Sequence, residues 1–142
     1  MTLHRILRGA LLTGLVLTAL PACATGQPAP ASNQVSYTTA QAEAGAQAYA
    51  SSACAACHMP DLSGGEGPPL TGPSFVANWG AGPVSSLFQF IKENMPATAP
   101  GSLSDQTYVE LVAYLLSTSG VPAGETALTM DEGKAFGIAI PR

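Results

Sequence analysis

Cys54-Ala55-Ala56-Cys57-His58 has the C-x-x-C-H spacing, which is the attachment sequence of c-type haem. Two thiols at this spacing on one helical turn can each add to a vinyl group on one edge of the macrocycle. The adjacent histidine then points its imidazole at the iron as the proximal ligand. The motif therefore predicts one covalently attached haem c, with thioether bonds to Cys54 and Cys57 and iron ligation by His58.

Three other kinds of site use similar residues and fit the sequence less well. A thioredoxin-like C-x-x-C needs a strand-helix-strand context, and the sequence has no strong alternating strand pattern. A structural zinc site needs four ligands, and only Cys54, Cys57 and His58 cluster in the sequence. A disulfide between the two cysteines leaves His58 without a role. The haem interpretation uses all three residues.

The N-terminus has the features of a signal peptide. Arg5 and Arg8 precede an apolar run at residues 9–20, which is too short to span a bilayer as a mature helix. The following Leu20-Pro21-Ala22-Cys23 resembles the lipobox of bacterial lipoprotein signal peptides. This resemblance implies that residues 1–22 are removed and that Cys23 becomes the lipidated first residue. The alternative is an ordinary signal peptide cut near Ala24, which would remove Cys23.

The rest of the chain divides into three expected segments. Residues 23–37 carry no charge and are rich in Ala, Pro, Ser and Gln, which is typical of a flexible linker. The haem domain is expected at residues 38–120 and a C-terminal extension at residues 121–142. Covalent haem attachment takes place outside the cytoplasm in bacteria, so the expected export agrees with the haem motif.

The charge balance excludes some kinds of partner. Five basic residues face nine acidic ones, which argues against a nucleic-acid binder. Removal of residues 1–22 leaves three basic residues against nine acidic ones, a net charge of −6. These few cations are scattered and form no polybasic membrane patch, so membrane attachment is expected through an N-terminal lipid only.

Capping residues and apolar spacing predict an all-α fold. The first helix begins at Thr38, with Gln41 as its capping-box partner, and runs to about Ser52. The second begins at Pro83, places apolar residues at the i, i+3, i+4, i+7 spacing, and ends before Pro96.

The third predicted helix is capped by Ser104, has Asp105 in its first turn, and ends at Gly120. Residues 59–82 are expected to form a loop-rich region, because Gly and Pro are frequent there. A loop of this length in a small domain usually wraps a ligand or serves a function. A further short helix is expected around residues 130–136.

A second axial ligand can be sought by counting the histidines and methionines. Without His4, which leaves with the signal peptide, His58 is the only histidine, so ligation by two histidines of the chain is excluded. Met59 adjoins His58 and cannot reach the opposite face of the same haem, and Met130 lies beyond the helix expected to end at Gly120. Met95 follows an amphipathic helix and lies in an irregular stretch before a proline. The sequence therefore favours Met95 as the second ligand of the iron.

From about residue 39 to residue 120 the chain resembles a class I monohaem cytochrome c. The resemblance rests on CAACH, a GPPL loop, a Met-Pro segment and an LVAYL helix. The run KENMPATAPGSLSDQTYVELVAYLL is similar to the cytochrome c domains of bacterial quinohaemoprotein alcohol dehydrogenases. The implied fold is a cytochrome c-like helical domain wrapped around one covalently attached haem. In the family, Gly45 and Tyr49 cross the last helix at Leu111 and Tyr114.

The resemblance also implies roles for two further residues at the haem. The carbonyl of Pro68 accepts the ring N–H of His58, which would fix the tautomer of the ligand. Pro68 matches the family best, and the neighbouring Pro69 leaves the alignment open by one position. Trp79 either donates its indole N–H to a haem propionate or packs in the core.

Iron with two ligands from the protein has no open site for a substrate, which favours electron transfer over chemistry at iron. The expected role is an exported monohaem cytochrome, not an enzyme, on the periplasmic side of a bacterial membrane. It would carry single electrons between a donor protein, such as a quinoprotein dehydrogenase on which it docks, and a respiratory acceptor. The alternative is a haem enzyme or a gas or peroxide sensor with an open sixth coordination site. Because lysines are few, docking is expected through an apolar patch near the haem edge.

Overall fold

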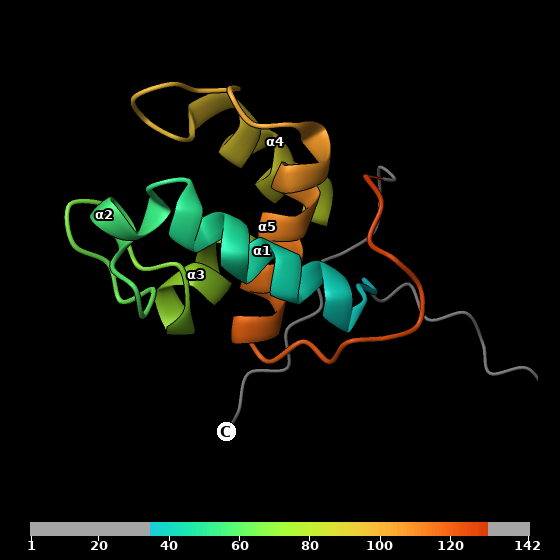
Figure 1. Ribbon diagram of the computed structural model, residues 1–142. Helices are drawn as coiled ribbons and strands as arrows, with labels where there is room; N and C mark the ends of the chain where they lie inside the picture. Colours follow the sequence, from blue (N-terminus) through green and yellow to red (C-terminus); the bar gives the residue numbers. More distant parts are fainter. Residues whose placement is uncertain (1–34, 131–142) are drawn as a thin grey trace, which may run out of the picture. The chain divides into compact units, whose positions relative to one another are not determined.

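The computed structural model describes residues 35–130 of the 142-residue chain. Its helices are α1 (Thr39–Ser51), α2 (Cys54–His58), α3 (Gly72–Trp79), α4 (Val84–Asn94) and α5 (Asp105–Thr118). Figure 1 shows α1 crossing α5, which is the most extensive contact between two helices, and α4 packs on α5 beside it. The described residues contain helices and loops but no β-strand, so the predicted all-α class is confirmed.

The capping box predicted for α1 is present. The Thr38 hydroxyl accepts the backbone N–H of Gln41 at 3.3 Å, and the Gln41 side chain accepts the N–H of Thr38 at 3.1 Å. These two bonds satisfy donors that the first turn of a helix would otherwise leave unpaired.

Gly45 allows α1 and α5 to approach each other closely. A Cβ atom at Gly45 would lie 1.9 Å from the carbonyl oxygen of Glu110, a distance that no side chain tolerates. One turn further along α1, the Tyr49 ring packs on Tyr114, with the ring centroids 5.6 Å apart. The crossing implied by the family resemblance is therefore present, and it brings the end of α1 to the haem-attachment motif.

Helices α4 and α5 form where the apolar spacing predicts them. α4 follows Pro83 and buries Val84, Leu87 and Phe88. α5 begins after Ser104, whose hydroxyl accepts the N–H of Thr107 at 3.1 Å. The inner face of α5 supplies much of the core.

α3 differs from the expectation that residues 59–82 are loop throughout. The helix starts at Gly72, has a proline in its first turn, and buries Phe75. With only eight residues it is too short to show a clear helical period, and the surrounding Gly and Pro indicate loop. Proline is nevertheless favoured at the start of a helix, which explains why this segment is helical.

The packed domain extends beyond the expected limits of residues 38–120 at both ends. The hydroxyl of Tyr37 donates to the carbonyl of Val121 at 2.5 Å. The Gln41 side chain binds both the N–H and the carbonyl of Leu128, at 2.7 and 3.0 Å. Tyr37, Val121 and Leu128 are buried. We call residues 35–38 and 121–128 together the terminal clasp.

Some expectations concern residues outside the described part of the chain. These are the signal peptide at residues 1–22, the lipid site at Cys23, and most of the short helix expected around residues 130–136. Within the described part, no helix combines the length and apolar character needed to cross a membrane.

Candidate functional site

A mostly apolar cavity of about 690 Å³ lies between the helices. It is bounded by α2, the loop at residues 66–70, α3, α4, the segment at residues 95–98, and α5. Ligand pockets in proteins typically have volumes of about 300–1,000 Å³. The six residues that the sequence places at the haem all line this cavity, namely Cys54, Cys57, His58, Pro68, Trp79 and Met95.

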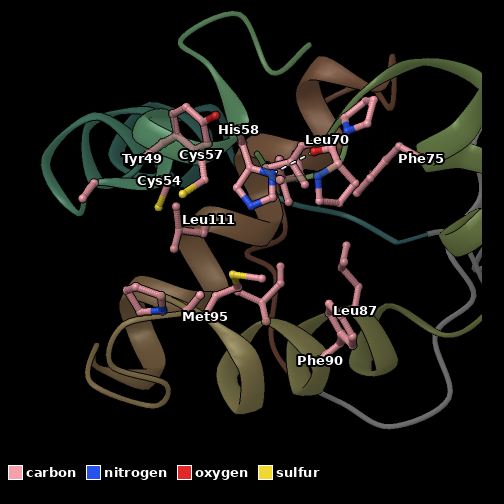
Figure 2. A pocket seen from close by; sticks show the side chains of 18 of the residues that line it. Tyr49, Cys54, Cys57, His58, Leu70, Phe75, Leu87, Phe90, Met95 and Leu111 are labelled. Atoms are coloured by element: carbon pink, nitrogen blue, oxygen red, sulfur yellow. Dashed lines mark hydrogen bonds between the residues drawn. The ribbon is translucent and has the colours of Figure 1, made fainter. Parts of the chain in front are cut away.

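The two cysteines lie on the short helix α2 and are not joined by a disulfide. Both line the cavity, and Figure 2 shows their sulfur atoms on its upper wall beside His58. Burial raises the pKa of the Cys54 thiol. Ala53 and Met59, which flank α2, have φ angles of 60° and 65°. Such positive φ angles at residues other than glycine cost about 1–3 kcal/mol each and occur often at functional sites.

His58 is almost completely buried, with 6% of its surface exposed. Its Nδ1 lies 2.8 Å from the carbonyl oxygen of Pro68, the bond drawn as a dashed line in Figure 2. Because a carbonyl can only accept, Nδ1 carries the proton, and Nε2 is the nitrogen left to bind a metal. The partner is Pro68 and not Pro69, which answers the question that the alignment leaves open.

Gly67 lets the loop pass close to this imidazole. A Cβ atom at Gly67 would lie 2.6 Å from Cε1 of His58. The N–H of Gly67 also donates to the carbonyl of Cys57 at 2.9 Å, which ties the loop to the end of α2. The loop therefore fixes both the position and the tautomer of His58.

Met95 enters the cavity from the side opposite His58 (Figure 2). It is the C-cap residue that follows α4, and its N–H donates to the carbonyl of Ile91 at 2.8 Å. Of the three methionines in residues 35–130, only Met95 lines the cavity. Met59 is 43% exposed to solvent.

Trp79 lies at the end of α3, lines the cavity, and is half-buried. Its ring packs against Phe90 of α4, with the ring centroids 5.1 Å apart. This position is compatible with both expected roles, the hydrogen bond to a propionate and packing.

Two tyrosines at the site were not among the candidates that the sequence indicates. The Tyr49 hydroxyl donates to the carbonyl of Met59 at 2.6 Å, and burial, ahead of the nearby Cys54 and Tyr114, raises the pKa of Tyr49 to about 12. The Tyr108 hydroxyl donates to the carbonyl of Met95 at 2.8 Å. The hydroxyl of each tyrosine thus holds the main chain beside one of the two expected ligands.

The residues of the cavity fit a haem c. Two unpaired thiols lie one turn apart on the wall that also carries His58, whose Nε2 is left to bind iron. A thioether faces them from the opposite wall, and most of the remaining lining is apolar. An all-α domain built around a cavity with these residues is characteristic of c-type cytochromes.

Comparison with known proteins gives the family. The family model for cytochrome c oxidase, cbb3-type, subunit III matches residues 40–115, more than half of the chain, and the chain belongs to this family. The chain is also similar to the thiosulfate dehydrogenase of Stutzerimonas stutzeri (strain A1501), with 43% identity over 81 residues. The match spans 51% of this chain but only 26% of that relative. No solved structure shows a significant match to the chain.

The family confirms several expectations made from the sequence. The protein is a c-type cytochrome with covalently bound haem c, and a domain of this kind suits haem-based electron transfer. Cytochrome c domains are typically extracytoplasmic.

Proposed function

We propose that this cytochrome is a single-electron carrier whose haem iron is ligated by His58 and Met95. The observation that carries the proposal is the placement of these two side chains on opposite walls of one cavity. The haem supplies the one-electron couple of its iron. The chain supplies both axial ligands, which leaves no coordination position for a substrate.

The environment of the two ligands supports a positive reduction potential. Ligation by His and Met, together with an apolar surrounding, raises the potential of a haem. The Pro68 carbonyl accepts the Nδ1–H of His58, which fixes the ring orientation and leaves Nε2 to bind the iron. The mostly apolar lining of the cavity would keep water away from the iron of a bound haem.

The rim of the cavity supports docking through an apolar surface. Its exposed apolar residues include Ala56, Pro68, Phe90 and Ala97. Glu66 is the only acidic or basic side chain besides His58 among the described residues that line the cavity. Complexes that transfer electrons are small and short-lived, and such a rim suits them without strong electrostatic steering.

The electron donor belongs to the dehydrogenases and the acceptor to the respiratory chain. A quinoprotein dehydrogenase is one candidate donor. The name of the similar protein, thiosulfate dehydrogenase, suggests a dehydrogenase of thiosulfate as a second candidate donor. We further assign the protein to the periplasmic side of a membrane, held by a lipid on Cys23 after removal of residues 1–22. Residues 23–37 would connect the lipid to the domain, with Val35 and Tyr37 packed against it.

The lipid anchor is tested by Cys23→Ser in cells that produce the full chain. The wild-type cytochrome should sediment with membranes, and the variant should not, while the haem spectrum is the same in both. Equal membrane association of the two proteins would contradict the anchor.

The axial ligand is tested by Met95→Ala in the mature holoprotein, with Met59→Leu as the matched control. The ferric wild-type protein should be low-spin and show the far-red band of Met–iron ligation. Met95→Ala should lose the band, and Met59→Leu should keep it, because Met59 lies outside the cavity lining. A Met95→Ala variant with the wild-type spectrum would refute the assignment. A high-spin ferric wild type would favour a haem enzyme or a gas or peroxide sensor instead.

A further inference from the structure

The Tyr108 hydroxyl makes two contacts with the segment that carries Met95. It donates to the carbonyl of Met95 at 2.8 Å and accepts the N–H of Leu103 at 3.4 Å. Tyr108 has no exposed surface, so this hydroxyl is shielded from water. The two ends of the loop at residues 95–103 therefore bind the same buried atom, the hydroxyl oxygen of Tyr108 on α5.

Most of the other bonds in this region are local or exposed. Inside the loop, the N–H of Ala99 donates to the carbonyl of Pro96 at 2.8 Å, which shapes a turn but does not reach α5. Outside it, Lys92 pairs with Asp105 at 2.7 Å, and both side chains are exposed to solvent. Exposed ion pairs contribute little to stability. Loss of a buried hydrogen bond costs more, because the separated donor and acceptor cannot bind water instead.

We propose that Tyr108 is a positioning residue, whose hydroxyl holds the Met95 thioether on the iron. This inference rests on the ligation by Met95 proposed above. The hydrogen bond fixes the carbonyl of the ligand residue itself, so the thioether cannot withdraw far from the cavity without breaking it. The hydrogen bond from Tyr108 to Met95 forms when the thioether binds the iron and breaks when the loop moves away from α5. It therefore favours the population of molecules in which Met95 is bound to the iron.

The ring of Tyr108 has a separate role in packing. It contacts Phe88 of α4 edge to face, with the ring centroids 6.4 Å apart. Tyr108→Phe keeps this contact and the filled space and removes only the hydroxyl. Tyr114→Phe is the matched control, because Tyr114 lies on the same helix, packs on Tyr49, and does not line the cavity.

The experiment is a titration of the ferric holoproteins with imidazole, followed through the far-red Met–iron band. Imidazole can bind only where Met95 has left, so its apparent affinity reports the detached population. Tyr108→Phe should bind imidazole about tenfold more tightly than wild type, the ratio expected for loss of one buried hydrogen bond. Its far-red band should also disappear at a lower temperature. Tyr114→Phe should match wild type in both measurements.

The outcomes separate this inference from the proposed function. A wild type with the far-red band, and a Tyr108→Phe variant with unchanged imidazole affinity, would overturn the role of Tyr108 alone. A wild type that lacks the band would overturn ligation by Met95 itself.

Hydrogen exchange in the wild-type protein gives a test that needs no substitution. The amide of Leu103 donates to the Tyr108 hydroxyl, so it should exchange slowly in the free protein and faster with imidazole bound. Equal exchange in the two states would contradict movement of the loop away from Tyr108.

Discussion

The main chain at Gly67 passes so close to the ring of His58, the expected iron ligand, that no side chain would fit at this position. The loop crosses the His58 ring at this residue, where a Cβ atom would be 2.6 Å from Cε1 and 2.7 Å from Nδ1. Since Nδ1 is also the atom that binds the Pro68 carbonyl, a side chain at Gly67 would disturb the orientation and the hydrogen bond of the histidine together.

Gly67→Ala should therefore shift the His58 ring and weaken its bond to Pro68. We expect the holoprotein to lose about 2 kcal/mol of stability from overpacking and to have a lower content of low-spin haem. Urea unfolding and the ferric spectrum measure the two effects. Gly82→Ala is the control, because nothing lies within 4 Å of a Cβ atom built there. Equal behaviour of the two variants would contradict the close approach.

The sequence predicts the residues proposed to bind the haem more readily than the residues that hold them in place. Cys54, Cys57 and His58 follow from one contiguous motif, and Met95 follows from counting the remaining ligands. No motif points to Tyr108, because an aromatic residue at helical spacing usually indicates only a core position. Its hydroxyl binds the main chain of Met95, a contact between segments that the sequence pattern does not reveal. The family resemblance favours Pro68 as the partner of His58, and the structure decides between Pro68 and Pro69, since both prolines offer a carbonyl.

At the level of elements, the crossing of α1 and α5 holds the haem-attachment turn against the rest of the domain. Gly45 is the contact point, and the atom it faces is a backbone carbonyl, that of Glu110. A backbone atom in a helix cannot swing aside as a flexible side chain can. A larger residue at Gly45 must therefore push the two helices apart.

Gly45→Ala should lower the stability of the holoprotein by about 3 kcal/mol, the upper end of the range for overpacking. The intrinsic preference of Ala for helices would by itself give about 1 kcal/mol of stabilisation, so the sign of the change is diagnostic. Thermal unfolding measures it. An Ala variant as stable as wild type would show that the helices do not cross at Gly45.

Two elements could not be predicted because their stabilising contacts are not local. α3 is short and lies in a Gly- and Pro-rich stretch, so its sequence indicates loop although Phe75 anchors it in the core. The terminal clasp joins Tyr37 to Val121, residues 84 positions apart, and neither segment shows a helical or strand period. By contrast, α1, α4 and α5 have strong caps or long apolar periods, and they form where these signals place them.

At the scale of the whole molecule, the charges lie apart from the proposed docking surface. Lys92 is the one lysine or arginine within residues 35–130, and it pairs with Asp105. The domain is therefore acidic, yet Glu66 is its only carboxylate among the described residues that line the cavity. A partner that docks over the cavity should meet an almost uncharged surface.

The rate of electron transfer to a partner should accordingly change little with salt. From about 0.01 to 0.15 M ionic strength, where the screening length shortens from about 30 to 8 Å, we expect less than a roughly threefold change in the second-order rate. Stopped-flow kinetics measures the rate. Glu66→Gln should leave the salt dependence nearly unchanged. A rate that falls steeply with ionic strength would contradict docking through the apolar rim.

The central claim is that the chain ligates its haem on both sides and so carries single electrons. The most direct test is a potentiometric titration of the mature holoprotein followed by its optical spectrum, with and without carbon monoxide. We predict one single-electron wave at a positive potential, a low-spin ferric form with the far-red Met–iron band, and a reduced form that carbon monoxide leaves unchanged. A high-spin ferric haem, or ready binding of carbon monoxide to the reduced form, would contradict the claim.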